Sequence, residues 1–213
     1  MEKYHKYVFD IDKRKFLGNF EEMYINEDIE GYDSWHQDKI PKEYVELVST
    51  LFKKDQFENV LDIGCGKGAL TNLIRDKLNI QHMTAIDISP TAISKARKRY
   101  KQIDFLVMDA FKLKFNNKFD LVICSEIFWY LLRDVRLILL KISQILVDGG
   151  HLFVSLYIPE NPIGKEIIAT ERDLVNLIKK YFRIKKCGKY LNRVYVLARK
   201  EFGNLNIPNK NSK

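Results

Sequence analysis

The feature that most constrains the fold is the stretch NVLDIGCGKGAL at residues 59–70, where three glycines on alternate positions follow an apolar run. Residues 59–63 predict a short buried strand, and residues 68–78 predict the helix that follows it. Glycine permits positive φ and lets a ligand approach the backbone closely. A helix amino terminus offers unpaired N–H groups to a polar or anionic ligand group. The turn therefore predicts a site for a nucleotide-like cofactor, whose identity the spacing leaves open.

The chain then alternates apolar strands with helical stretches. Strands are predicted at residues 59–63, 82–87, 103–108, 119–124 and 150–157. Helices are predicted at residues 68–78, 90–100, 131–146 and 171–181, and a closing antiparallel hairpin at residues 182–199 around Leu191–Asn192. This alternation indicates an α/β fold with a mainly parallel sheet and helices on both faces. Such sheets bind ligands at the carboxyl ends of their strands.

The 213 residues fit one domain. Residues 1–56 are expected to form an N-terminal helical lid segment, with one helix over RKFLGNFEEMYI at residues 14–25 and another over residues 41–52. Residues 57–202 are expected to form the cofactor-binding domain. The polar tail at residues 203–213 is expected to be disordered.

Composition restricts the expected cellular location of the chain and the kinds of site it can form. No apolar run approaches the roughly 20 residues that a membrane-spanning helix needs, and the amino terminus has no secretory signal pattern. Cys65, Cys124 and Cys187 lie too far apart for a disulfide framework or a metal cluster. We therefore expect a cytoplasmic protein with no membrane contact and no metal, present as a monomer or a homodimer.

The positive charge is concentrated in the last quarter of the chain. Residues 161–213 hold 13 Lys and Arg against 4 Asp and Glu, although the net charge of the whole chain is only +8. A basic surface of this kind allows an RNA partner. However, the basic residues are not interleaved with the aromatic side chains on which bases stack. A small-molecule acceptor is therefore expected rather than a nucleic acid.

The first strand ends in Asp62, and Gly64, Cys65 and Gly66 follow it. The loop loosely satisfies the dinucleotide pattern G-x-G-x-x-G or -A, so a nicotinamide or flavin oxidoreductase is a rival interpretation. Two details argue against it. The third glycine comes one residue early, and a carboxylate at position 62 suits an ammonium or another cation better than a pyrophosphate.

Two more strands end in an aspartate. The carboxylate of Asp87 can accept hydrogen bonds from two vicinal ribose hydroxyls, which fits NAD and an adenosyl cofactor equally. Alternatively Asp87 caps the next helix, although Ser89 before Pro90 can fill that role. Asp109 can accept from an exocyclic adenine amine, with the N–H of Ala110 bonding a ring nitrogen. A turn-forming role for Asp109 is the alternative.

The fourth strand ends in Ser125-Glu126, and Phe128, Trp129 and Tyr130 follow. An unpaired glutamate and three aromatic rings beside a cofactor suit a polar substrate with apolar faces, such as a sugar or an amine. In the alternative interpretation, Phe128 and Tyr130 pack into the core and Glu126 caps a neighbouring segment.

Five segments in this order, VLDIGCGKG, AIDISPTAI, FLVMDAF, FDLVICSEI and LLKISQILVDGGHLFVS, resemble the class I S-adenosylmethionine-dependent methyltransferases over roughly residues 57–200. The resemblance implies a Rossmann-like class I methyltransferase fold with a seven-stranded sheet. It implies S-adenosyl-L-methionine as cofactor and S-adenosyl-L-homocysteine as product. The segments EGYDSWH, SEIFWYLL and VSLYIPENPIG are similar to the nodulation N-methyltransferase (NodS-like) branch, which methylates an amine on an amino sugar. Ser34 stands where that branch usually has a proline.

The resemblance implies a role for each matching position. Gly64, Cys65 and Gly66 would line the methionine part, Asp87 would hold the ribose, and Asp109 with Ala110 would hold the adenine. The whole expected cofactor set is Trp35, Asp62, Gly64, Cys65, Gly66, Asp87, Ile88, Met108, Asp109, Ala110 and Ser125. The expected substrate-binding set is Tyr32, Trp129, Tyr130 and Tyr157.

Methyl transfer from a sulfonium to nitrogen is an in-line displacement, so alignment and exclusion of water can supply most of the catalysis. A protonated amine must first lose its proton, and water can suffice as the acceptor. Glu126 is the first candidate base or orienting group, His36 the second and His151 the third. In the alternative interpretation His151 is structural, as a lone histidine on a strand more often is. An O-methyltransferase acting on an alcohol or a phosphate and an RNA methyltransferase remain alternatives.

Overall fold

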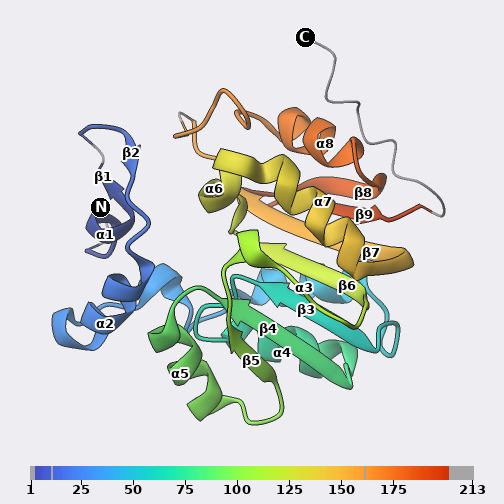
Figure 1. The fold of residues 1–213 in the computed structure, drawn as a ribbon, viewed down its shortest axis with the longest axis horizontal. Coiled ribbons are helices and arrows are strands. Elements are labelled where there is room, and N and C mark those ends of the chain that lie inside the picture. The colour runs from blue at the N-terminus through green and yellow to red at the C-terminus, as the bar shows by residue number, and fades with distance from the viewer. Residues whose placement is uncertain (1–2, 11, 161, 202–213) are drawn as a thin grey trace.

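The computed structural model describes residues 3–10, 12–160 and 162–201 (Figure 1). Its centre is a seven-stranded sheet with the order β5-β4-β3-β6-β7-β9-β8, in which the first five strands are parallel and β9 runs antiparallel to both of its neighbours. The strands are β3 (Asn59–Ile63), β4 (His82–Asp87), β5 (Asp104–Val107), β6 (Phe119–Ser125), β7 (Leu146–Tyr157), β8 (Arg183–Tyr190) and β9 (Arg193–Arg199). The predicted parallel sheet and closing hairpin are confirmed.

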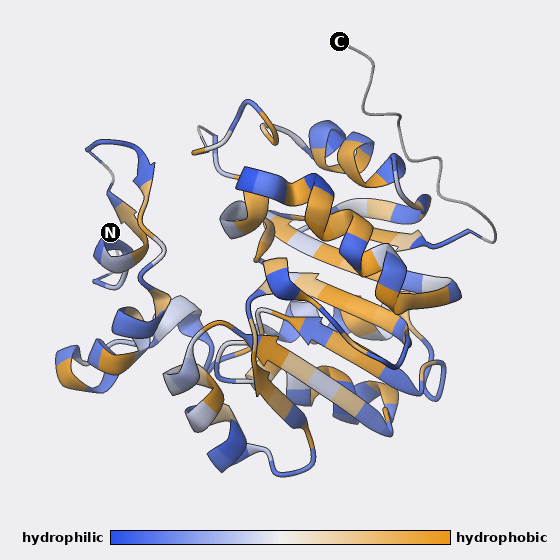
Figure 2. Cartoon of the chain, in the orientation of Figure 1, coloured by the Kyte–Doolittle hydropathy of each residue, from blue (hydrophilic) through white to orange (hydrophobic). Residues whose placement is uncertain are grey.

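Hydrophobic clusters cover both faces of the sheet. Alternate residues of a strand point to opposite faces, so Leu121 and Ile123 of β6 join one cluster whereas Val122 and Cys124 join the other. The first cluster is covered by α3 (Lys42–Leu51), α4 (Ala69–Leu78) and α5 (Pro90–Arg99), and the second by α7 (Val135–Ile145) and α8 (Glu171–Lys179). Figure 2 shows the apolar residues concentrated along the strands.

The part of the chain before α3 lies beside the sheet rather than on one of its faces (Figure 1). This N-terminal segment, defined as the described residues between 3 and 40, contains α1 (His5–Val8), β1 (Phe9–Asp10), β2 (Lys15–Phe16), α2 (Phe20–Glu30) and the 3-10 turn η1 (Ser34–His36). By contrast, α3 buries Tyr44 and Val48 against the sheet.

The helix predicted over residues 14–25 is wrong in its first half. Arg14 and Gly18 have φ of +47° and +74°, which no α-helix accommodates. Lys15 and Phe16 instead pair with Asp10 and Phe9 as a short antiparallel ladder. The ring of Phe16 packs on that of Phe9 across this ladder and on that of Tyr130, which follows β6, contacts that a helix over residues 14–25 does not anticipate.

The start of another predicted helix moves. The helix predicted over residues 131–146 begins at Val135, because the side chain of Asp134 accepts a hydrogen bond from Leu137 N–H as its N-cap. Residues 128–134 form the short helix α6 (Phe128–Leu131) and the turn η3 (Leu132–Asp134) instead. The predicted tail at residues 203–213 lies outside the described residues. Within the described residues, no helix is long and apolar enough to cross a membrane.

Candidate functional site

The carboxyl ends of β3, β4, β5 and β6 meet at one edge of the sheet, as the sequence predicts. Ladder partners link Asp62 to Ala85 on one side and to Ile123 on the other. The N–H of Gly64 donates to the carbonyl of Ile86 at 2.8 Å, which brings the turn after β3 against the end of β4. The ends of these four strands therefore lie along one edge of the sheet.

The glycine turn has the predicted conformation. Gly64, Gly66 and Gly68 have φ of +79°, +53° and +81°, values that L side chains rarely adopt. A Cβ on Gly64 would lie 2.3 Å from the side chain of Ile127, and one on Gly68 would lie 2.6 Å from the ring of Phe105. Both the backbone and the packing therefore require glycine at these two positions.

Asp62 lies beneath the turn with only 2% of its surface exposed. Its Oδ2 accepts a hydrogen bond from the hydroxyl of Thr71 at 2.6 Å. Burial raises the pKa of Asp62 to about 6, and the Thr71 hydroxyl only partly offsets this effect. A cation brought next to this carboxylate would therefore relieve an unfavourable buried charge. Its role toward a ligand ammonium stays a prediction.

Asp87 at the end of β4 has both carboxylate oxygens fixed by the backbone. Oδ2 accepts from Gly66 N–H and Oδ1 accepts from Ser89 N–H, each at 2.9 Å. Burial nevertheless raises the pKa of Asp87. Ser89, not Asp87, caps α5, because its hydroxyl accepts from Ala92 N–H at 3.0 Å. The Asp87 oxygens retain lone pairs for two vicinal hydroxyls. Ile88, also expected in the cofactor set, is 52% exposed.

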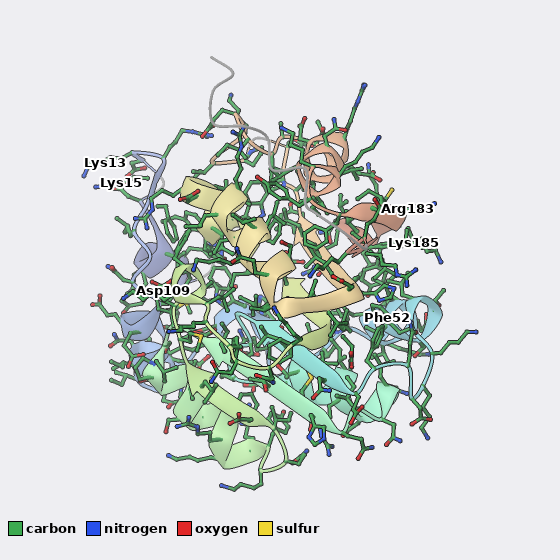
Figure 3. The ribbon with its side chains drawn as sticks, turned by 45° about the vertical axis from the view of Figure 1, so that its right-hand side comes forward. Lys13, Lys15, Phe52, Asp109, Arg183 and Lys185 are labelled. Carbon is green, nitrogen blue, oxygen red and sulfur yellow. The ribbon has the colours of Figure 1, made fainter. Side chains whose placement is uncertain are left out.

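At the end of β5, Asp109 caps a short 3-10 turn, because its Oδ1 accepts from Phe111 N–H at 2.9 Å. The turn-forming alternative is thus part of its role, and the second oxygen of the carboxylate is not used in that bond. Met108 is half-buried and Ala110 is buried beside it. In Figure 3, Asp109 lies on the side of the molecule that carries the N-terminal segment.

Ser125 at the end of β6 belongs to a cluster of three hydroxyls. Its Oγ lies 2.9 Å from Ser155 Oγ and 3.2 Å from the phenol oxygen of Tyr44, which also lies 3.3 Å from Ser155 Oγ. Burial raises the pKa of Tyr44, so the phenol stays protonated at neutral pH. The sequence reveals Tyr44 only as part of the apolar face of a helix, and its link to the site comes from tertiary packing.

Glu126 is not the unpaired glutamate that the sequence predicts. Its Oε2 accepts from Tyr157 N–H at 2.8 Å, and its Oε1 accepts from Arg193 Nε at 2.9 Å. Withdrawal from water raises the pKa of Glu126 in spite of both contacts. The backbone at Glu126 is left-handed, with φ of +59°. Arg193 follows the hairpin turn 67 residues later, so no local pattern reveals this pair.

The aromatic residues after β6 separate into different roles. Phe128 is fully buried in the core, which is the alternative considered for it. Trp129 is half-buried and donates through its indole N–H to the carbonyl of Tyr157 at 2.8 Å, while the Tyr157 side chain is 41% exposed. Tyr130 instead contacts the N-terminal segment. Its ring centroid lies 4.9 Å from that of Phe20 and 5.8 Å from that of Trp35.

The N-terminal segment brings the remaining predicted residues to this aromatic group. Trp35 and His36 have left-handed backbones, with φ of +60° and +53°. The rings of Trp35 and Tyr32 both pack against Tyr4, and the Tyr32 hydroxyl donates to the carbonyl of Met23 at 2.6 Å. His36 is exposed next to Trp35, with its ring 6.4 Å from that of Tyr4.

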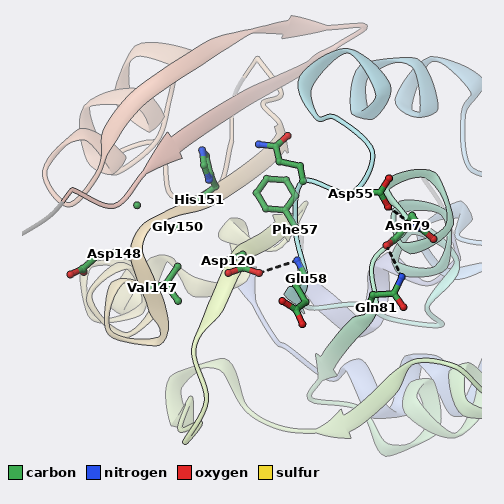
Figure 4. A pocket seen from close by; sticks show the side chains of 12 residues that line it. Asp55, Phe57, Glu58, Asn79, Gln81, Asp120, Val147, Asp148, Gly150 and His151 are labelled. Carbon is green, nitrogen blue, oxygen red and sulfur yellow. Dashed lines mark hydrogen bonds between the residues drawn. The ribbon is translucent and has the colours of Figure 1, made fainter.

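His151 lies away from this edge, so its prediction as a third candidate base is wrong. It pairs with Leu121 near the start of β6, whereas Ser155 pairs with Ser125 at the site. There His151 lines a polar pocket of about 620 Å³, with its ring 5.5 Å from that of Phe57 (Figure 4). Along β7, His151 comes four residues before Ser155, the residue that pairs with Ser125 at the end of β6.

Residues 54–201 match a protein family described as methyltransferase domain. The chain is 27% identical over 136 residues to nodulation protein S of Rhizobium tropici, covering 60% of this chain and 56% of that protein. It is 30% identical over 141 residues to malonyl-[acyl-carrier protein] O-methyltransferase of Acetivibrio thermocellus, covering 64% of this chain and 48% of that protein. The chain therefore spans about half the length of these two relatives.

Solved structures share the fold. The N-methyltransferase NodS from Bradyrhizobium japonicum WM9 in complex with S-adenosyl-L-homocysteine gives a TM-score of 0.67 at 21% identity, covering 85% of this chain and 98% of that chain. A chain of the complex between the Haloferax volcanii Trm112 methyltransferase activator and the putative methyltransferase gives 0.70 at 17% identity, covering 85% and 97%. These matches confirm the predicted Rossmann-like class I methyltransferase fold.

Proposed function

The chain belongs to the methyltransferase domain family, and we propose that it uses S-adenosyl-L-methionine as its cofactor. We further propose that its acceptor is the amine of an amino sugar or of a similar small polar metabolite. The observation that carries the proposal is Glu126, whose carboxylate is held at the carboxyl end of β6 by Tyr157 and Arg193. The solved structure of NodS is that of an N-methyltransferase, which supports a nitrogen acceptor.

The residues at the strand ends fit the cofactor. We propose that Asp87 binds the ribose and that Asp109 and Ala110 bind the adenine. We also propose that Asp62 lies next to the ammonium group of the cofactor's methionine part, which the Gly64–Gly66 turn lines. The fit rests on the glycine turn, whose positive φ values leave a backbone that a ligand can approach closely, and on the two backbone-fixed oxygens of Asp87. When bound, the cofactor supplies a methyl group on a sulfonium, and the protein is left to align and desolvate the acceptor.

We propose that Glu126 orients the acceptor amine by accepting a hydrogen bond from one of its N–H groups. The Glu126–Arg193 pair carries no net charge, so it favours a neutral amine, which has a free lone pair, over an ammonium. The raised pKa of Glu126 also makes its carboxylate a better proton acceptor than an exposed glutamate. The side chains proposed to line the acceptor-binding part of the site are those of Trp129, Tyr130, Tyr157, Tyr32 and His36.

A carboxylate acceptor is the second candidate, and Arg193 is the observation that favours it. Its guanidinium is 32% exposed beside Glu126, and guanidinium groups bind carboxylates well. The malonyl-[acyl-carrier protein] O-methyltransferase relatives support this alternative. Arg193 would then hold the acceptor, and Glu126 would only position Arg193.

Kinetics of two variants separate these proposals. If Glu126 orients or deprotonates an acceptor amine, Glu126→Gln should lower kcat for an amino sugar by about 10²–10⁴-fold. The affinity for S-adenosyl-L-homocysteine should be unchanged. Arg193→Met should have the smaller effect. If the acceptor is a carboxylate, Arg193→Met should instead raise KM for a malonyl thioester strongly. Full amine methylation by Glu126→Gln at every pH would refute the role of Glu126.

Location and other partners remain predictions. A cytoplasmic protein, a monomer or homodimer, and the absence of a nucleic-acid partner are all expected. The basic side chains Arg183 and Lys185 on β8 lie on the opposite side of the molecule from Asp109 in Figure 3. This arrangement supports a small acceptor over RNA, because a nucleic acid bound to β8 would be held away from the proposed cofactor site.

A further inference from the structure

Lys67, the side chain between the last two glycines of the turn, is buried, with 2% of its surface exposed. Its ammonium lies 2.9 Å from Glu27 Oε1, 2.7 Å from Asp33 Oδ1 and 3.1 Å from Asp38 Oδ2. Burial opposes the positive charge, but the hydrogen bonds that the ammonium donates to these carboxylates outweigh this effect and raise the pKa of Lys67. All three carboxylates belong to the N-terminal segment, so one lysine of the cofactor turn binds that segment.

The same carboxylates also bind helix α5. Glu27, itself only 4% exposed, accepts from Lys95 at 2.7 Å through its other oxygen, and it accepts from Ser34 N–H at 2.8 Å. Asp38 pairs with Arg99. Four anionic and three cationic side chains thus form one cluster, here called the Lys67 ion cluster: Glu27, Asp28, Asp33, Asp38, Lys67, Lys95 and Arg99.

A neutral contact places the segment directly on the glycine turn. Gln37 Oε1 accepts from Lys67 N–H at 2.7 Å, and the Gln37 amide donates to the hydroxyl of Tyr24 at 3.0 Å. A Cβ on Gly66 would lie 2.2 Å from Gln37 Nε2. The N-terminal segment is therefore in contact with the same backbone that is proposed to surround the cofactor.

We propose that Lys67 is a positioning residue, which holds the N-terminal segment over the cofactor turn and thereby couples closure of that segment to cofactor binding. Trp35 and His36 lie between Asp33 and Asp38 in the sequence, so the Lys67 ion cluster fixes both ends of the stretch that carries them. Removing one partner of a buried ion pair leaves an uncompensated charge, which is strongly unfavourable. Loss of Lys67 should therefore release the segment while the sheet remains folded.

Lys67→Met tests the proposal, and Lys6→Met is the matched control. Lys6 forms an ion pair with Glu30 inside the N-terminal segment, and this pair does not reach the glycine turn. Binding of S-adenosyl-L-homocysteine is measured by calorimetry, so the result does not depend on the identity of the acceptor. Lys67→Met should weaken binding by about 5- to 150-fold, the usual range for coupled sites. Lys6→Met should change it by no more than about twofold.

Fluorescence supplies a readout of the segment itself. The chain has two tryptophans, so a Trp129→Phe background leaves Trp35 as the only one. In this background Lys67→Met should shift the Trp35 emission to the red and expose the N-terminal segment to limited proteolysis, because Trp35 loses its packing against Tyr130 outside the segment. Lys6→Met should leave both readouts as in the background protein.

A double-mutant cycle separates the ion cluster from a general loss of structure. If Lys67 acts through Glu27, the variant Lys67→Met/Glu27→Gln should lose no more affinity than Lys67→Met alone. Should Lys67→Met fail to fold, Asp33→Asn/Asp38→Asn leaves the glycine turn intact and should give the same weakened binding and red shift. Unchanged affinity and emission in the folded variant, or losses that simply add, would overturn the proposal.

Discussion

Replacing Asp62 by Asn should make the cofactor-free protein more stable at neutral pH. The pKa of Asp62 is raised from 3.8 to about 6 because the carboxylate is buried. The folded state therefore binds its proton more tightly than the unfolded state does. Above about pH 6 the ionised carboxylate destabilises the fold by up to about 3 kcal/mol, since each pKa unit corresponds to about 1.4 kcal/mol. Asn has the same shape, keeps an acceptor for Thr71 and carries no charge.

The gain should depend on pH in a defined way. The penalty develops between the unfolded and folded pKa values, so Asp62→Asn should exceed the wild type by about 2–3 kcal/mol at pH 7.5 and match it near pH 4. Denaturant unfolding followed by circular dichroism at the two pH values measures the difference. Asp104→Asn, at an exposed position on β5, serves as the control. A gain that is absent at pH 7.5, or equal at both pH values, would refute the reasoning.

The remaining predictions concern the other strand ends. Asp87→Ala should weaken S-adenosyl-L-homocysteine binding by about 1.5–3 kcal/mol through loss of charge-assisted hydrogen bonds, and calorimetry that finds equal affinity in the folded variant would exclude the ribose role. Gly68→Ala should lower stability by about 1–3 kcal/mol, because the residue has φ of +81° and its Cβ would lie 2.6 Å from Phe105. Thermal melting measures that loss, and an unchanged melting temperature would argue against it.

The residues at the strand ends were predictable because short sequence patterns mark where each buried strand begins and ends. Apolar runs mark the buried strands, and parallel strands must end at one edge, so Asp62, Asp87 and Asp109 were expected together. The N-cap of α5 at Ser89, followed by Pro90, was also predictable, because a capping residue before proline is a pattern of adjacent residues. Such features need only the neighbouring few residues.

Features that depend on distant partners were not predictable. Glu126 meets Arg193 only because β9 lies beside β7, and Lys67 meets Glu27 across 40 positions. A lysine in a glycine-rich turn is ordinarily solvated, so nothing in its neighbourhood signals burial. The helix predicted over residues 14–25 was wrong in its first half, where the ring of Phe16 packs on that of Tyr130, 114 positions later.

The most direct test of the acceptor follows the methyl group itself. The wild-type protein is incubated with S-adenosyl-L-methionine carrying a deuterated methyl group and with an amino sugar, its N-acetylated form or a malonyl thioester, and the products are analysed by mass spectrometry. The account predicts label on the nitrogen of the amino sugar and none on the N-acetylated form. Label only on the malonyl carboxylate, or equal label on the two sugars, would contradict it.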